Sequence, residues 1–119
     1  MQKETFTKSD MRALRRLAEI AWDRGLSKAL DQLHHTFAEW KRGAMTSFEL
    51  SNRIHEFHDG DARDLYKAYT GPHPSQTVAH ALANHHIDAS EVPEDLLAKL
   101  TPAVDFFTSL QASSSGDPT

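Results

Sequence analysis

The densest group of chemically reactive side chains lies in one short stretch, IHEFHDGDARDLY. It contains two histidines three residues apart, His55 and His58, and Asp59 follows directly. On a helix, residues three or four apart lie on one face, so these side chains can approach a single cation. The spacing makes His55, His58 and Asp59 a candidate site for a divalent metal, with His34 or His35 as a further ligand.

The His58-Asp59 pair resembles the metal-binding motif of the HD superfamily of helical phosphohydrolases. In that family an upstream histidine, a His-Asp pair and a distant aspartate ligate divalent metals. The order of residues here is the same, with an earlier histidine at His34 or His35 and a later aspartate at Asp88 or Asp105. The resemblance implies a metal-dependent phosphohydrolase that binds metal through His58 and Asp59.

The same stretch has an explanation that needs no metal. The apolar stripe that ends at Phe57 would place Asp61 next, and an unpaired aspartate is costly in a dry core. We therefore predict a break or kink near Gly60. On this interpretation His58 caps the end of one helix, and Asp61 caps the start of the next.

Composition narrows the classes of function. The chain has no cysteine, which excludes disulfides, thiolate metal sites and cysteine nucleophiles. Thirteen basic and seventeen acidic residues give a net charge of -4, which disfavours binding to nucleic acid. No apolar run reaches the length of a signal peptide or the ~18 residues of a membrane span, so we expect a cytoplasmic protein without membrane contact.

Apolar residues recur at intervals of three and four near the N-terminus and predict two helices, over residues 9–24 and 27–42. Gly25 is expected to separate them, and the short connection predicts an antiparallel N-terminal hairpin. Phe37 and Trp40 continue the apolar stripe of the second helix. We therefore expect both side chains in the core.

A capping box, Thr46 with Glu49, predicts the start of a third helix. Further helices are expected over residues 75–86 and 93–110, after a turn rich in proline, and Pro102 either kinks the last of them or starts another helix. The serine-rich end of the chain offers no apolar anchor. The prediction is one all-α domain, a bundle of five or six helices over residues 1–110, followed by a disordered tail over residues 111–119.

Signatures of common catalytic folds are absent from the sequence, including the nucleophile elbow and glycine-rich phosphate loops. Broad apolar stripes, together with Trp22 and Trp40, offer surface for a partner helix. We interpret the chain as a non-enzymatic helical interaction or regulatory module without a cofactor, which binds a protein partner or forms a homo-oligomer. The alternative is the metal-dependent phosphohydrolase, which requires a divalent cation.

Overall fold

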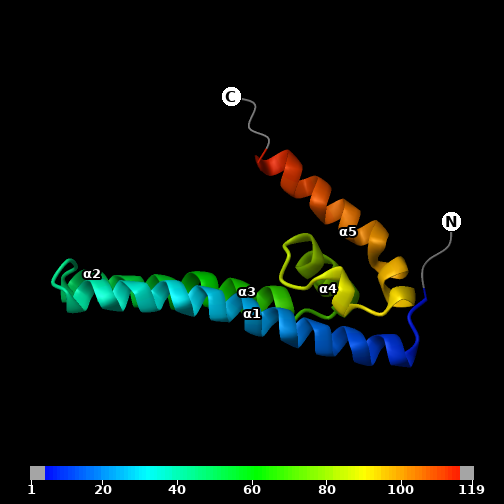
Figure 1. Ribbon diagram of the computed structural model, residues 1–119, viewed down its shortest axis with the longest axis horizontal. Coiled ribbons are helices and arrows are strands. Elements are labelled where there is room, and N and C mark those ends of the chain that lie inside the picture. Colours follow the sequence, from blue (N-terminus) through cyan, green and yellow to red (C-terminus); the bar gives the residue numbers. More distant parts are fainter. Residues whose placement is uncertain (1–4, 116–119) are drawn as a thin grey trace. The chain divides into compact units, whose positions relative to one another are not determined.

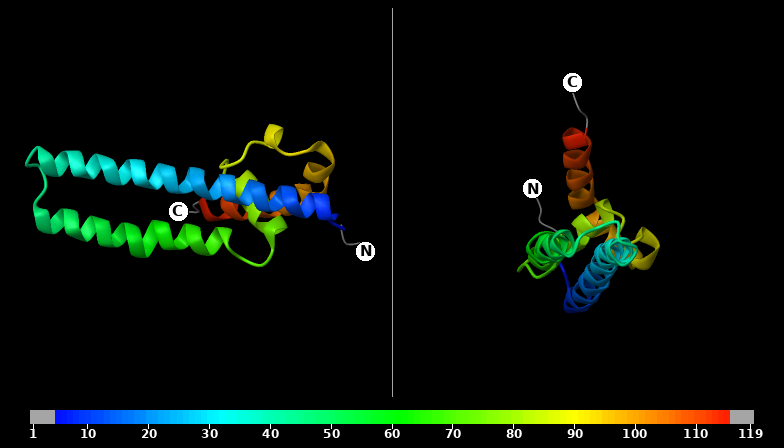
Figure 2. Two further views of the ribbon diagram at one scale, coloured as in Figure 1. Left: turned by 90° about the horizontal axis from the view of Figure 1, so that it is seen from below. Right: turned by 90° about the vertical axis from the view of Figure 1, so that its left-hand side faces the viewer.

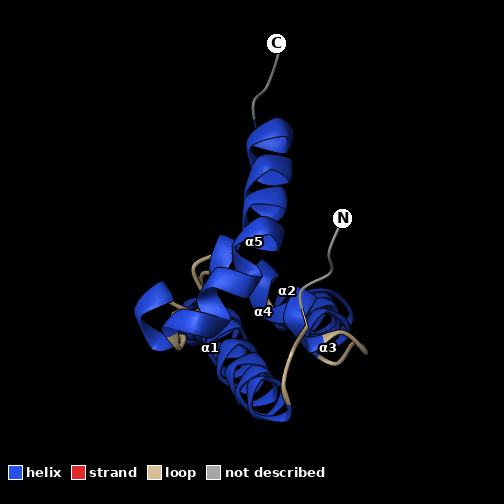
Figure 3. Cartoon of the chain, turned by 90° about the vertical axis from the view of Figure 1, so that its right-hand side faces the viewer, coloured by secondary structure: helices blue, strands red, loops and turns tan. Residues whose placement is uncertain are grey.

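The computed structural model describes residues 5–115, with side chains through Ala112, and its regular structure is helical throughout that range (Figures 1 and 3). The elements are α1 (Lys8–Lys41), α2 (Ser47–Phe57), the π turn η1 (His58–Ala62), α3 (Arg63–Tyr69), α4 (Pro74–Ala83), the 3-10 turn η2 (Ala89–Glu91) and α5 (Glu94–Ser115). The all-α class is confirmed. Because α2, η1 and α3 follow one another without a break, residues 5–115 form four continuous helices besides η2, rather than five or six.

The predicted N-terminal hairpin is wrong, because α1 runs unbroken through Gly25. The inward face of this helix keeps its spacing across the glycine, with buried positions at Leu14, Ala18, Ala21, Gly25 and Ala29. A single glycine inside a helix costs about 1 kcal/mol relative to alanine. Here the continuous apolar face outweighs that cost, and Gly25 does not take the positive φ that ends a helix.

The turn that folds the helices back comes one glycine later, at Gly43. Gly43 has φ 81°, its N–H donates to the carbonyl of Trp40, and the N–H of Ala44 donates to that of Glu39. This is the Schellman pattern that ends helices at a left-handed residue. The predicted end of a helix near residue 42 is thereby confirmed.

The capping box that opens α2 is also confirmed. The Thr46 hydroxyl accepts from the Glu49 N–H at 3.1 Å, and the Glu49 carboxylate accepts from the Thr46 N–H at 2.9 Å. The bond from that backbone N–H holds the pKa of Glu49 below its usual value. Both partners are local in sequence, so this helix start needs no tertiary contact.

The chain divides into two compact units. We call the first the terminal unit, which comprises the chain up to Ala21 and from Gly71 onward, and the second the hairpin unit, residues 22–70. Within the hairpin unit, the second half of α1 and the rod formed by α2, η1 and α3 run side by side in opposite directions (Figures 1 and 2). We call these two segments the first arm and the second arm.

The terminal unit holds most of the buried apolar side chains, drawn from α1, α4, the loop around η2 and α5. They are Leu14, Leu17, Ala18, Ala21, Val78, Ala79, Ala81, Leu82, Ala83, Ile87, Val92, Leu96 and Leu100. The small residues of α4 permit close approach of neighbouring helices. This unit is therefore a conventional helical core.

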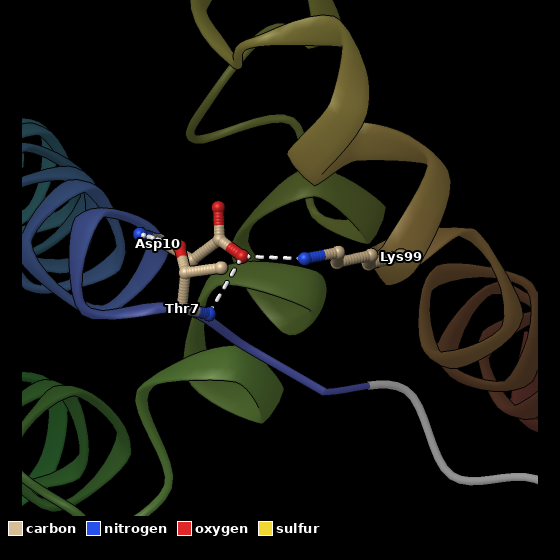
Figure 4. A network of polar contacts seen from close by, with 3 residues as sticks. All are labelled: Thr7, Asp10 and Lys99. Atoms are coloured by element: carbon tan, nitrogen blue, oxygen red, sulfur yellow. Dashed lines mark hydrogen bonds and ion pairs between the residues drawn. The ribbon is translucent and has the colours of Figure 1, made fainter.

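An ion pair ties the start of α1 to α5 within the terminal unit (Figure 4). The ammonium of Lys99 lies 2.6 Å from a carboxylate oxygen of Asp10. Asp10 also accepts from the Thr7 N–H and donates its own N–H to the Thr7 hydroxyl, both at 3.0 Å. The Lys99 hydrogen bond, followed by the Thr7 N–H, holds the pKa of Asp10 below its usual value of 3.8.

The end of α5 overlaps the segment for which we predicted disorder. The helix continues from Gln111 to Ser115, and the Gln111 amide donates to the side-chain carbonyl of Asn84 at 2.6 Å. Residues 116–119 of the predicted tail lie outside the described residues.

Candidate functional site

The π turn η1 corrects a mismatch in the apolar pattern of the second arm. In an uninterrupted α-helix, the inward positions after Phe57 would be Asp61, Asp64 and Ala68. A π turn closes on the fifth residue instead of the fourth and so adds one residue. As a result Ala62, Leu65 and Tyr69 take the inward positions, and they are less exposed than the residues they replace.

The predicted capping roles of His58 and Asp61 are therefore wrong. The backbone of Phe57, His58, Ala62 and Arg63 stays in the right-handed helical region, and neither end of η1 has a capping side chain. The sequence irregularity near Gly60 is real, but it appears as a widened helical turn, and neither a break nor the predicted kink is confirmed.

Two of the predicted metal ligands lie close together. The His55 imidazole Nε2 is 3.6 Å from a carboxylate oxygen of Asp59, and these side chains are 83% and 58% exposed. Such exposed pairs contribute little to stability. His58 lies on the same turn and lines, together with Asp59, a pocket described below.

The other proposed ligands do not complete a metal site. His34 and His35 are neighbours on α1, with ring centroids 6.4 Å apart, and His35 lies 3.9 Å from Asp31. Within residues 5–115, no three histidine, aspartate or glutamate side chains gather closely enough to hold a metal ion. His34 lies on the first arm and the His58-Asp59 pair lies on the second arm, and these residues do not form a three-ligand cluster.

A pocket of about 370 Å³ lies beside the π turn. It is lined by one face of the second arm: His58, Asp59, Ala62, Arg63 and Tyr66. The ring of Tyr66 packs edge-on against Trp22 of the first arm, with centroids 5.8 Å apart. This pocket therefore combines a cation, a carboxylate, an imidazole and an aromatic face.

The hairpin unit has two edges, which the order of residues identifies. The two arms run in opposite directions, and the inward face of each arm is turned toward the other arm. The residue that directly follows an inward residue therefore lies on the same side of the hairpin in both arms. Residues that directly precede an inward residue lie on the other edge. A second pocket of about 300 Å³ fits this rule, because Gln32, Glu56 and Asp61 line it together, and they precede Leu33, Phe57 and Ala62.

One edge is rich in acids. It also carries the basic residues Arg24, Lys28 and Arg53. Its acids precede inward positions on both arms and are Glu39, Glu49, Glu56, Asp61 and Asp64. We call this the acidic edge.

The opposite edge carries large apolar side chains. Leu30, Phe37 and Tyr66 follow the inward residues Ala29, Thr36 and Leu65. Ile54 lies on the other side of the inward face from Arg53, which lines the pocket at the acidic edge. Their exposed fractions are 46% for Leu30, 39% for Phe37, 41% for Ile54 and 57% for Tyr66. We call these four residues the apolar edge.

We did not predict the apolar edge from the sequence, because Phe37 and Trp40 were both expected in the core. Phe37 is exposed, so that prediction is wrong, and Trp40 is half-buried with its indole N–H donating to the Ser47 hydroxyl at 3.0 Å. The available signal was the recurrence of an apolar residue immediately after an inward one. It is informative only once the pairing of the two arms is known.

The chain matches no protein-family model, no curated protein and no solved structure. No helix within residues 5–115 is both long enough and apolar enough to span a bilayer.

Proposed function

We propose that this protein is a non-enzymatic interaction module whose hairpin unit binds a partner along the apolar edge. The observation that carries this proposal is the exposure of four large apolar side chains on one edge. Taking about 200 Å² for a fully exposed large side chain, the apolar edge presents roughly 350 Å². Patches of that size on soluble proteins commonly mark binding sites.

The sparse interior of the hairpin unit supports the same proposal. Its buried apolar residues are Ala29, Leu50 and Tyr69. Covering the apolar edge would remove further apolar surface from water at about 25 cal/mol per Å². A partner helix with its own apolar stripe fits such an elongated edge, because side chains at intervals of three and four match in both helices.

Site-specific photo-crosslinking in growing cells tests this proposal. The probe residue p-benzoylphenylalanine is placed at position 37, on the apolar edge, or at the exposed position of Ala38, on the outer face of the same helix. We expect a crosslinked adduct from position 37 and little or none from position 38. Absence of an adduct from position 37, or equal yield from both positions, would contradict binding along the apolar edge.

A further inference from the structure

We infer that the partner on the apolar edge is a second copy of this chain, so that two hairpin units pack as four helices. The inference rests on the function proposed above and names its partner. Small helical units of about 40–60 residues are marginal alone and are commonly stabilised by disulfides, metals or association. The chain has no cysteine, and no metal-binding cluster exists among residues 5–115. Of these three kinds of stabilisation, association is therefore the one that fits the hairpin unit.

Charge also favours a second copy at this edge. In a two-fold symmetric interface identical surfaces meet, so charges of one sign at the centre would face each other. Between Leu30 and Phe37 the residue on this edge is His34, and Ser51 and His58 flank Ile54. Lys41 lies beyond Phe37 at one end of the edge, and Arg63 lies between His58 and Tyr66. Contact through the acidic edge would take many charged residues of both signs out of water, which is costly unless each is paired, so the apolar edge is the more favourable surface for self-association.

The area is of the right order for a modest dimer. A standard interface covers about 800 Å² on each partner, and the four apolar side chains supply roughly 350 Å² of it. The half-buried residue Leu26 follows the inward residue Gly25 and so lies on the same edge. Aromatic residues such as Phe37 and Tyr66 are typical centres of binding energy in interfaces.

Sedimentation equilibrium of the full chain tests this inference. We expect the wild type to reach twice the 13.4 kDa chain mass in the micromolar range. Phe37→Glu places a charge inside the contact and is expected to weaken association by about 100-fold. The matched variant Ala38→Glu adds the same charge one residue away, on the outer face, and should change association by about twofold or less.

A second pair of variants covers the case in which Phe37→Glu lowers the helix content. Ile54→Glu lies on the apolar edge of the other arm, and Asn52→Glu lies at an exposed position of the same helix. Weakened association in Ile54→Glu, with Asn52→Glu like the wild type, supports the second copy. Equal effects of the two variants in each pair would overturn it.

The outcome also separates this inference from the proposed function. A wild-type protein that stays monomeric at all concentrations overturns self-association, as does a position-37 adduct within one chain or with a different protein. An adduct with a different protein would leave the proposed function standing. A monomer without any adduct from position 37 would contradict both.

Discussion

The terminal unit and the hairpin unit are built from the same kind of amphipathic helix, and even share α1, but they differ in what their apolar side chains contact. Among the described residues, thirteen buried apolar residues lie in the terminal unit and three in the hairpin unit. In the terminal unit the buried apolar residues come from α1, α4, α5 and the loop around η2. In the hairpin unit two arms cover only one face of each other, which leaves the apolar edge exposed. The difference shows that helical periodicity marks surfaces able to be buried, without revealing what buries them.

The largest expected effect comes from the core of the terminal unit. Leu96 is 1% exposed, so Leu96→Ala should lower the free energy of unfolding by about 2 to 5 kcal/mol through lost contacts and a cavity. Leu65→Ala in the hairpin unit, where the side chain is half-buried, should cost roughly 1 kcal/mol. Urea denaturation followed by circular dichroism measures both, and equal costs would break the distinction between the units.

Trp40 tests how tightly the side chains of the hairpin unit are packed. A fully buried tryptophan replaced by alanine costs about 3 to 5 kcal/mol. Trp40 is half-buried and keeps one hydrogen bond, so we expect Trp40→Ala to cost roughly 1 to 2 kcal/mol in the same denaturation experiment. A cost in the fully buried range would mean that the hairpin unit is packed as tightly as the terminal unit.

Two glycines of the hairpin unit are expected to respond in opposite directions. Gly60 lies in the π turn, and a Cβ atom there would meet no neighbour within 4 Å. Gly60→Ala should therefore raise the free energy of unfolding by about 0.5 to 1 kcal/mol, because alanine loses less backbone entropy. Gly43→Ala should lower it by about 1 kcal/mol, because φ at Gly43 is positive. A destabilising Gly60→Ala would instead favour a break in the helix at that residue.

The ion pair between Asp10 and Lys99 predicts a pH dependence that belongs to the terminal unit. The pKa of Asp10 is lowered in the folded state, so its stabilising contribution is complete above about pH 4 and is lost as the pH falls through the lowered pKa. Asp10→Asn should lower the melting temperature at pH 7, and the two proteins should converge in strong acid. A constant difference in melting temperature between pH 7 and pH 2 would contradict this role.

The smallest effect is expected from added metal. Since no three-ligand cluster exists among residues 5–115, zinc or manganese should leave the melting temperature of the wild type unchanged. The phosphohydrolase hypothesis predicts a rise that is lost in His58→Ala. Such a result would identify His58 and Asp59 as metal ligands and would support a functional site at the π turn.

Local signals in the sequence determined the helical class, the end of α1 at Gly43 and the start of α2 at Thr46. Each of these depends on hydrogen bonds or steric limits within about five residues, so the sequence alone contains the necessary information. The segment around Gly60 was also identified as irregular, because Asp61 falls on the apolar stripe.

Only the tertiary structure decided how that irregularity is resolved and where the hairpin lies. Helix α1 continues through Gly25 because its buried face extends on both sides of that residue, and η1 adds one residue because Leu65 and Tyr69 must face the first arm. The exposure of Phe37 likewise follows from the pairing of the two arms. Burial depends on contacts between residues far apart in the sequence, whereas caps and turns depend on neighbours.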